Sequence, residues 1–206
     1  MAYVLGFFAA DGNIVVSKRG AFYFSAYSAD KVILLAILKV LQANHKISKR
    51  ESDTGVVYRF QIGSKEIVND LFSLGLTPNK ATRMEIPKVP KRFIGDFVRG
   101  YFDGDGNVWM GFVNRKRKKP TPVLQVAFTS GSRNFLFGIK NSLGFLGIKG
   151  GSIFYVKNKN CSRVLFSTLD SLKIYRIMYN VPNPLYLGRK KRIFEKFLKA
   201  RNAVVV

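Results

Sequence analysis

A motif that occurs twice is the feature of this sequence that most restricts its fold. The stretch VLGFFAADGNI at residues 4–14 and the stretch VRGYFDGDGNV at residues 98–108 align without a gap. The alignment places Asp11 opposite Asp105. Each copy is apolar, as expected of a buried helix, and ends in Asp and Gly, which favour helix ends and turns. One copy could be an ordinary helix cap, but two copies indicate a duplicated unit.

The segments that follow the two copies have one order: hairpin, helix, hairpin, helix. Runs of β-forming residues around turn residues predict the hairpins, and apolar residues at helical spacing predict the helices. In the first half these segments are residues 13–28, 29–44, 45–63 and 64–75. In the second half they are residues 107–130, 132–147, 150–168 and 169–180. The predicted apolar stripe of the helix at 29–44 consists of Val32, Leu35, Ile37, Leu38 and Leu41. The chain is therefore predicted to be an internal duplication of class α+β.

Two prolines mark the place where the halves join. Pro87 and Pro90 lie just before the second copy of the motif, and proline cannot continue a helix. We therefore expect an N-terminal half over residues 1–86, a linker over residues 87–92 and a C-terminal half over residues 93–206.

Small residues give each motif helix a face that allows close packing. Gly6 and Ala10 are four positions apart in the first copy, and Gly100 and Gly104 are four apart in the second. Small residues at this spacing let two helix backbones approach closely. We therefore expect the two motif helices to pack face to face.

That packing would bring Asp11 and Asp105 together at the C-terminal ends of the helices. The two carboxylates would repel each other, and the negative ends of the helix dipoles would disfavour them further. Divalent cations between the acids would remove this repulsion. Mg²⁺ takes one or two protein carboxylates and completes its shell with water and substrate phosphate. The pair therefore predicts a site for metal-assisted cleavage of a phosphodiester.

The charge of the chain indicates a polyanionic partner. There are 35 Lys and Arg residues against 12 Asp and Glu, a formal net charge of +23. The basic residues lie in predicted hairpins and loops and not on one amphipathic helix, so nucleic acid is favoured over a membrane surface. No apolar run has the length of a membrane span. The single cysteine, Cys161, and the single histidine, His45, exclude an internal disulfide and a zinc cluster.

The two copies, VLGFFAADG and VRGYFDGDG, resemble the paired motifs of the LAGLIDADG homing endonucleases in their single-chain form. The stretches GLTPNKATRMEIPKVP at residues 75–90 and NPLYLGRKKRIFEKF at residues 183–197 resemble the segments that close each half in that family. The resemblance implies two pseudo-symmetric αββαββα halves packed through their motif helices. It further implies antiparallel sheets that form a saddle on double-stranded DNA, and a monomer.

The resemblance also implies roles for individual residues. Asp11 and Asp105 match the metal-binding catalytic acids, and the carbonyls of Ala10 and Gly104 are implied as further metal ligands. The expected cofactor is Mg²⁺. Because Ca²⁺ is larger and tolerates irregular oxygen shells, we expect it to support binding but little cleavage.

An active-site lysine of the family matches Lys80 in the first half. In the second half it matches Lys190, with Lys191 as the competing assignment. The implied role of these lysines is to stabilise charge or order water near the scissile phosphate, and contact with DNA phosphate in general is the alternative. The chain departs from the family pattern at Ala9, where the second copy has Asp103. This departure concerns local packing more than catalysis.

Alternation along the strands separates a core face from an outward face. Apolar residues occupy every second position in AFYFSAY and YRFQI, and the polar residues between them should face outward. The residues that this test points outward are Ser17, Arg19, Tyr23, Ser25, Arg59, Gln61, Gln125 and Arg163. Arg and Gln on a two-stranded ribbon can read base edges in the major groove. We therefore predict that these residues bind DNA.

Two further basic segments are predicted to contact DNA. One is the tip of the hairpin at 107–130, with Arg115, Lys116, Arg117, Lys118 and Lys119. The other is VKNKNCSR, with Lys157 and Lys159. Consecutive cations suit phosphates more than bases, so the hairpin tip is interpreted as a clamp on the DNA backbone.

The function expected from these features is site-specific cleavage of double-stranded DNA, by an enzyme of the mobile-intron type. The alternative is an RNA maturase or a non-cleaving DNA-binding protein on the same scaffold. A pure binder has no need of two adjacent acids under a polyanion, so Asp11 and Asp105 favour the nuclease. No self-splicing residues are found, which favours an intron-encoded or free-standing protein over an intein. The compartment stays open between a prokaryotic cytoplasm and an organelle.

Overall fold

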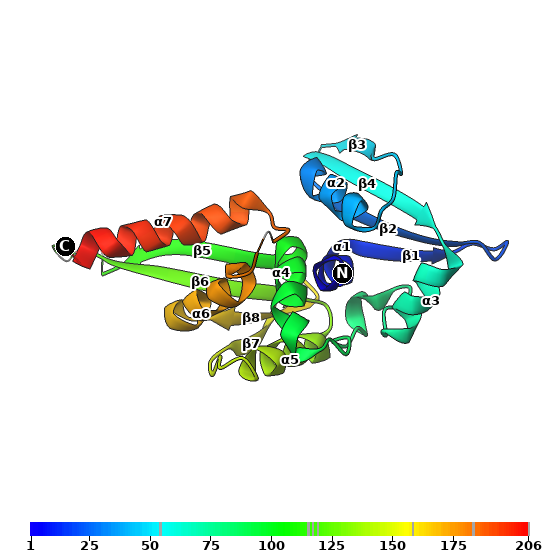
Figure 1. Cartoon of the computed structure of the whole chain (residues 1–206). Coiled ribbons are helices and arrows are strands. Elements are labelled where there is room, and N and C mark those ends of the chain that lie inside the picture. The colour runs from blue at the N-terminus through cyan, green and yellow to red at the C-terminus, as the bar shows by residue number, and fades with distance from the viewer. Residues whose placement is uncertain are drawn as a thin grey trace.

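The computed structural model describes residues 1–53, 55–114, 116, 118, 120–157, 159–182 and 184–205. Within these residues, two halves repeat one order of elements (Figure 1). The first half contains α1 (Ala2–Asp11), β1 (Gly12–Val16), β2 (Phe22–Ser28), α2 (Lys31–Val40), β3 (Ser48–Ser52), β4 (Gly55–Gly63) and α3 (Lys65–Ser73). The second half contains α4 (Ile94–Asp105), β5 (Gly106–Val113), β6 (Thr121–Ser130), α5 (Arg133–Gly144), β7 (Ser152–Val156), β8 (Cys161–Phe166) and α6 (Thr168–Tyr179). Two 3-10 turns, η1 (Lys80–Thr82) and η2 (Lys91–Phe93), lie between them. The predicted αββαββα order is confirmed in both halves.

Each half folds its four strands into one antiparallel sheet. The strand orders are β1-β2-β4-β3 and β5-β6-β8-β7, so the two sheets share a topology. The apolar positions of neighbouring strands pair in register, as in the buried row Ile14, Phe24 and Ile62. The matching buried row in the second sheet is Val108, Val126 and Phe166. Helices α2 and α3 pack on the first sheet, and α5 and α6 pack on the second.

The motif helices α1 and α4 form the joint between the halves. A Cβ atom added to Gly6 would lie 2.0 Å from the carbonyl oxygen of Phe97, and one added to Gly100 would lie 2.0 Å from the carbonyl oxygen of Tyr3. Glycine is therefore required at both positions, because any side chain would push the backbones apart. The predicted face-to-face packing of the motif helices is confirmed, and the apolar core runs continuously through both halves.

A seventh helix, α7 (Gly188–Val205), lies beyond the repeated elements and packs against β5 and β6 (Figure 1). Its side chains Phe194 and Phe197 are buried. The family resemblance implies a closing segment at residues 183–197 and no helix beyond the repeated elements. The helical spacing of Ile193, Phe194 and Phe197 is the signal that was missed. Among the described residues, no helix has both the length and the apolarity needed to cross a membrane.

Helix α2 buries a different face from the one predicted. Ile33, Leu34, Ile37 and Leu38 are buried, whereas Val32 and Leu35 are 78% and 51% exposed. The predicted stripe was wrong for Val32 and Leu35, because six of the seven residues from Val32 to Leu38 are strongly apolar and several stripes fit the same helical spacing. Contact with β2 and β4 selects the stripe that is buried.

Candidate active site and nucleic-acid interface

The carboxylates of Asp11 and Asp105 lie side by side where the two motif helices end. Both helices end at their aspartate, and the next residue, Gly12 or Gly106, begins a strand. A Cβ atom added to Gly104 would lie 2.4 Å from the Cβ of Ala10 and 2.9 Å from Oδ2 of Asp11. The glycine in the second copy therefore allows the first acid to approach the second helix. The predicted proximity of the two acids is what the structure shows.

The surroundings of the two acids disfavour their charged forms. Burial and, to a lesser degree, the neighbouring Asp105 together raise the pKa of Asp11 to about 6, although Lys190, Lys80 and Arg189 oppose the shift. The pKa of Asp105 is also raised, because the packed helix ends reduce its hydration, and Lys190 and Lys80 oppose this. Asp105 is the more exposed of the two side chains. Asp105 is therefore accessible to a substrate that approaches the site.

Each closing segment places one lysine at the end of one motif helix. The ammonium group of Lys80 donates a hydrogen bond to the carbonyl of Gly12 and lies 5.4 Å from the centre of the Phe8 ring. Burial lowers the pKa of Lys80, and Asp105 and Asp11 oppose the shift. Lys80 is thus held against the first motif helix by one carbonyl and one ring.

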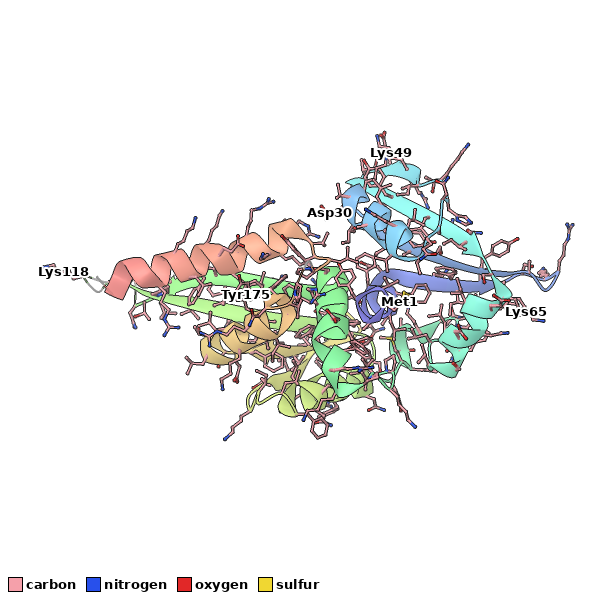
Figure 2. The ribbon with its side chains drawn as sticks, in the orientation of Figure 1. Met1, Asp30, Lys49, Lys65, Lys118 and Tyr175 are labelled. Carbon is pink, nitrogen blue, oxygen red and sulfur yellow. The ribbon has the colours of Figure 1, made fainter. Side chains whose placement is uncertain are left out.

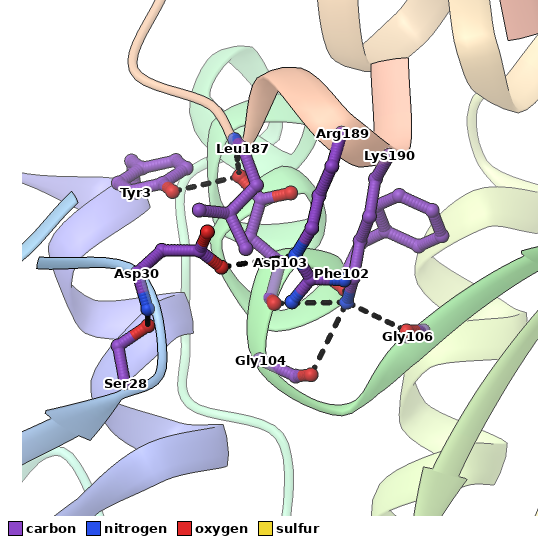
Figure 3. A network of polar contacts seen from close by, with 10 residues as sticks. All are labelled: Tyr3, Ser28, Asp30, Phe102, Asp103, Gly104, Gly106, Leu187, Arg189 and Lys190. Carbon is purple, nitrogen blue, oxygen red and sulfur yellow. Dashed lines mark hydrogen bonds and ion pairs between the residues drawn. The ribbon is translucent and has the colours of Figure 1, made fainter. Parts of the chain in front are cut away.

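Lys190 has the equivalent position at the second helix end. Its ammonium group lies 2.6 Å from the carbonyl oxygen of Gly106 and 5.1 Å from the centre of the Phe102 ring. It also lies 2.5, 2.8 and 3.2 Å from the carbonyl oxygens of Phe102, Asp103 and Gly104 (Figure 3). Burial lowers the pKa of Lys190 to about 8. Lys190 therefore binds the C-terminal carbonyls of α4 with all the donors of an ammonium group.

Lys191 points away from the acids. Its ammonium group lies 4.6 Å from the centre of the Tyr186 ring, 5.8 Å from that of Tyr179 and 3.6 Å from a carboxylate oxygen of Glu195. Of the two lysines that compete in the sequence, the structure therefore brings Lys190 to the acids.

Asp103, the acid that the first copy lacks, binds inside the protein. It is 2% exposed, and its Oδ2 accepts hydrogen bonds from the Tyr3 hydroxyl at 2.7 Å and from the Leu187 backbone N–H at 2.8 Å (Figure 3). Burial raises its pKa, and the bonds from Tyr3 and Leu187 oppose the shift. Asp103 therefore supports the end of α4, in keeping with the structural role expected for this position.

The oxygen donors at the helix ends suit a hard divalent cation. Asp11 and Asp105 supply two carboxylates, and the carbonyls of Ala10 and Gly104 belong to the residues just before them. The Gly104 carbonyl also interacts with Lys190. Within the described ranges, no cluster of three or more His, Cys, Asp or Glu side chains is present. Two carboxylates are enough for Mg²⁺, which keeps water and phosphate oxygens in its shell, but not for a closed structural zinc site.

Several residues predicted to bind DNA share the sheet face that points away from the core. Cross-strand pairing places Tyr27 beside Arg59 on the first sheet, and Thr129 beside Arg163 on the second. The side chains of the predicted set on this face that are exposed or half-exposed are Tyr23, Arg59, Gln61, Gln125 and Arg163. The Arg59 guanidinium lies 5.5 Å from the centre of the Tyr27 ring, and Nε of Arg163 donates to Oγ1 of Thr129 at 3.3 Å.

Strand alternation was wrong about the exposure of Ser25, and it does not apply to Ser17 and Arg19. Ser25 is only 1% exposed, because it lies on a central strand between Asn13 and Gln61 and beside Tyr27. Ser17 and Arg19 follow the end of β1 and lie in the hairpin turn, where alternation does not apply. The Ser17 hydroxyl accepts a hydrogen bond from the Ala21 backbone N–H at 2.9 Å. Arg19 is exposed at the turn.

The basic hairpin tips are at the edge of the molecule. Lys118 lies at the far end of the β5–β6 hairpin (Figure 2), and Lys116 in the same turn is exposed. Lys157 and Lys159 are exposed in the β7–β8 turn. Three predicted residues of the β5–β6 tip lie outside the described residues: Arg115, Arg117 and Lys119.

Two residues on the outward faces had no predicted role. Trp109 is 49% exposed, and a Cβ atom added to Gly111 would lie 2.2 Å from its indole ring. The indole therefore packs over Gly111 on the same face. Arg50 lines a hollow of about 460 Å³ together with Tyr27, Ser48, Val57 and Arg59. Its two-residue spacing from Ser48 could have placed it on this face.

Comparisons with known proteins support the duplication and the fold. Residues 92–177 match the family model described as LAGLIDADG-like domain. No curated protein matches the chain by sequence. A solved structure of the meganuclease I-SmaMI bound to uncleaveable DNA is 15% identical, with a TM-score of 0.65 over 96% of this chain and 89% of that one.

Two other solved structures have the same fold as this chain. The homing endonuclease I-WcaI bound to its DNA recognition sequence is 18% identical, with a TM-score of 0.61 over 93% of this chain and 83% of that one. A structure of mesophilic variants from the homing endonuclease I-DmoI is 13% identical, with a TM-score of 0.64 over 95% of this chain and 96% of that one. At these identities the likeness shows the fold, while the family model covers the second motif. Residues 92–177 are therefore similar to a LAGLIDADG-like domain, and the chain as a whole has the fold of the homing endonucleases I-SmaMI, I-WcaI and I-DmoI.

Proposed function

We propose that this protein is a site-specific endonuclease that cuts both strands of duplex DNA with the help of divalent cations. The observation that carries the proposal is the pair Asp11 and Asp105, held together at the helix ends although burial and mutual repulsion raise the pKa of Asp11 to about 6. An acid pair kept at this cost is expected where cations bind. Two solved structures of the meganuclease I-SmaMI, one bound to uncleaveable DNA and one bound to an uncleaved DNA target in the presence of calcium ions, support the same class of activity.

Each part of the site has a proposed task. Asp11 and Asp105 would hold the cations, with the carbonyls of Ala10 and Gly104 as further oxygen donors. When bound, a divalent cation offsets the charge that develops on a phosphate and makes a nearby water molecule more acidic. Mg²⁺ is the ion that the two carboxylates suit best.

The lysines place positive charge beside the acids. Lys80 binds one carbonyl and one aromatic ring, so its ammonium group retains donors for a phosphate or a water molecule. Lys190 uses its donors on the carbonyls of α4 and thereby holds the helix end that carries Asp105. Both lysines favour the ionised acids, because each opposes the rise in pKa of Asp11 and Asp105.

The outward sheet faces would bind the duplex. Arg59, Gln61, Gln125 and Arg163 have the donors and reach needed to read base edges, and the basic hairpin tips would contact phosphates. The net charge of +23 attracts a polyanion from a distance. Because one chain carries both halves, we propose that it acts as a monomer on one long target site, in the manner of an intron-homing enzyme.

The test is incubation with a randomised duplex library and Mg²⁺, followed by sequencing of the cut ends. We expect a single preferred site cut on both strands by the wild type, no cutting in chelator, and little cutting with Ca²⁺ in place of Mg²⁺. The Asp11→Asn and Asp105→Asn variants should bind the selected site and fail to cut it. Binding without cutting by the wild type would favour the maturase or non-cleaving alternative, and full activity in chelator would contradict a metal mechanism.

A further inference from the structure

The closing segment of the N-terminal half packs on the C-terminal half. A Cβ atom added to Gly131 would lie 2.6 Å from the carbonyl oxygen of Ala81, and one added to Gly138 would lie 2.5 Å from the side chain of Ile86. Both glycines belong to the second half, one just before α5 and one within it. The segment that carries Lys80 is therefore supported from the other half of the molecule.

Ser132 makes the polar contact in this joint. Its hydroxyl donates a hydrogen bond to the Met84 carbonyl at 2.6 Å and accepts one from the Phe135 backbone N–H at 3.3 Å, so it also caps α5. Ser132 and Met84 are each 3% exposed. The Met84 backbone N–H donates to the Lys80 carbonyl at 2.8 Å. Two buried hydrogen bonds thus connect Ser132 to the backbone of Lys80, whose ammonium group binds at the end of α1.

Asp30 has the equivalent place in the first half. It precedes α2 as Ser132 precedes α5. The backbone N–H of Asp30 donates to the Ser28 hydroxyl at 3.0 Å, and that of Ser132 donates to the Ser130 hydroxyl at 3.1 Å. The shared local geometry shows that the two residues correspond in the duplication.

Asp30 also reaches the closing segment of the opposite half. Its Oδ2 accepts a hydrogen bond at 2.9 Å from Nε of Arg189, the residue next to Lys190 (Figure 3). This ion pair is half-exposed, so solvent screening makes it weaker than the buried contact of Ser132. Each closing segment is thus held by the residue that precedes the second helix of the other half.

We propose that Ser132 and Asp30 are positioning residues, each of which fixes the active-site lysine carried by the opposite half. This inference rests on the proposed function, in which Lys80 and Lys190 act at the acid pair. Each lysine lies at the end of a different motif helix, so we expect each to serve mainly the cut of one strand. Loss of the Ser132 hydrogen bond and loss of the Asp30 ion pair must then slow different strands. A substitution that only destabilises the fold would slow both strands equally.

The experiment measures the nicking rate of each strand, on a target duplex with a different dye on each strand. Ser132→Ala should slow one strand on the order of tenfold relative to the other, because small displacements of catalytic groups have effects of this size or larger. Asp30→Asn should shift the ratio toward the opposite strand by a smaller factor. Ser132→Thr, which keeps the hydroxyl, should restore the wild-type ratio.

Two matched controls separate positioning from stability. Ser64→Ala removes the cap of α3, where the Ser64 hydroxyl accepts from the Ile67 backbone N–H at 3.2 Å, without touching the closing segments. Asp70→Asn removes an exposed acid from α3. Both should leave the strand ratio unchanged. Equal slowing of both strands by Ser132→Ala, or shifts of the same sign in Ser132→Ala and Asp30→Asn, would overturn the inference.

A second measurement does not depend on cleavage. A lysine-acylating reagent, with the sites quantified by mass spectrometry, reports how firmly each ammonium group is held. Labelling of Lys80 should rise several-fold in Ser132→Ala but not in Ser64→Ala, and labelling of Lys190 should rise in Asp30→Asn. If the wild type cuts no DNA, the proposed function fails while labelling still tests the positioning. Unchanged labelling in both variants would contradict it.

Discussion

The phenol of Tyr3 in α1 donates a hydrogen bond of 2.7 Å to Asp103 in α4, which joins the two motif helices by a buried polar contact. The corresponding positions across the duplication hold Phe97 and Ala9, which are both apolar and buried. The missing acid of the first motif is therefore matched by a missing hydroxyl on the opposite helix. A polar pair at one set of these positions and two buried apolar residues at the other make the two halves unequal where they meet.

Loss of the Tyr3 hydroxyl should destabilise the fold. Tyr3→Phe leaves a carboxylate oxygen of the buried Asp103 with fewer partners, so we expect a loss of roughly 1 to 3 kcal/mol in the free energy of unfolding. Tyr155→Phe is the matched control, because it removes an exposed hydrogen bond to Asn160, and it should change stability by less than about 0.5 kcal/mol. Denaturant unfolding of both variants measures the difference. Equal losses in the two variants would contradict the prediction.

Methyl groups at the joint should be poorly tolerated. Gly6→Ala or Gly100→Ala places a Cβ atom 2.0 Å from a backbone carbonyl oxygen of the other helix, so the helices must separate and the loss should exceed about 3 kcal/mol. Gly144→Ala, at the end of α5 and in open space, should instead be neutral or stabilising by up to about 1 kcal/mol. Thermal unfolding of the three variants distinguishes these outcomes. A stable, fully active Gly100→Ala protein would show that the joint is less tight than described.

Lys190 and Lys191 should differ in their effects on cleavage. Lys190→Ala leaves the carbonyls at the end of α4 without their ammonium partner and removes a charge that favours the ionised acids. We expect cleavage to fall by at least about tenfold, since an unsatisfied buried polar group costs roughly 1 to 3 kcal/mol. Lys191→Ala removes contacts with Tyr186, Tyr179 and Glu195, none of which lies at the acid pair, and should keep most activity. A larger loss in Lys191→Ala would reverse the assignment.

Cleavage should depend on the ionisation of Asp11. Its pKa is raised from the ordinary 3.8 to about 6, and a carboxylic acid must lose its proton to bind a cation. At saturating DNA and a fixed, subsaturating Mg²⁺ concentration, the rate should therefore rise as the pH increases through about 6. Higher Mg²⁺ should move the midpoint of the curve to lower pH, because cation binding competes with the proton. A midpoint that does not respond to Mg²⁺ would contradict the role of this acid.

The same raised pKa predicts how stability without metal varies with pH. Between the ordinary pKa of 3.8 and the folded pKa of about 6, the folded protein binds more protons at Asp11 than the unfolded chain does. The contribution of Asp11 to stability is therefore complete below pH 4 and is lost as the pH rises through 6. In chelator at pH 7.5, Asp11→Asn should be more stable than the wild type by roughly 1 to 2 kcal/mol, and this advantage should vanish near pH 4. Asp70→Asn is the control for loss of an exposed acid.

Base reading and phosphate binding should separate in affinity measurements. Arg59→Ala should weaken binding to the preferred site by roughly 1 to 3 kcal/mol and relax preference at one or two base pairs. Replacing Lys116 and Lys118 by Gln should weaken binding to all duplexes alike and reduce the salt slope by about 0.9 for each phosphate that the protein no longer neutralises. A library of single-base substitutions, bound at two salt concentrations, measures both effects. If the tip variant changes base preference and Arg59→Ala does not, the sheet face has been assigned wrongly.

The sequence by itself determined the duplication, the order of elements and the pairing of Asp11 with Asp105. Each of these depends on local patterns: apolar spacing sets helix or strand, and glycine at a helix face sets how closely two helices can approach. A repeat of the whole pattern then requires two similar halves. For the same reason alternation along β2 and β4 identified the outward face that carries Arg59 and Gln61.

Only the tertiary structure decided the relationships between segments distant in the chain. It placed Lys190 and not Lys191 at the acids, because α7 packs on β5 and β6 with Lys190 against the end of α4 and Lys191 against Tyr179 and Tyr186. It buried Ser25 beneath its cross-strand neighbours, and it set Ser132 and Asp30 against the closing segments of the opposite halves. A sequence records which residues can form such contacts. Which ones meet depends on how α1 and α4 join the two halves, and that is a property of the whole folded chain.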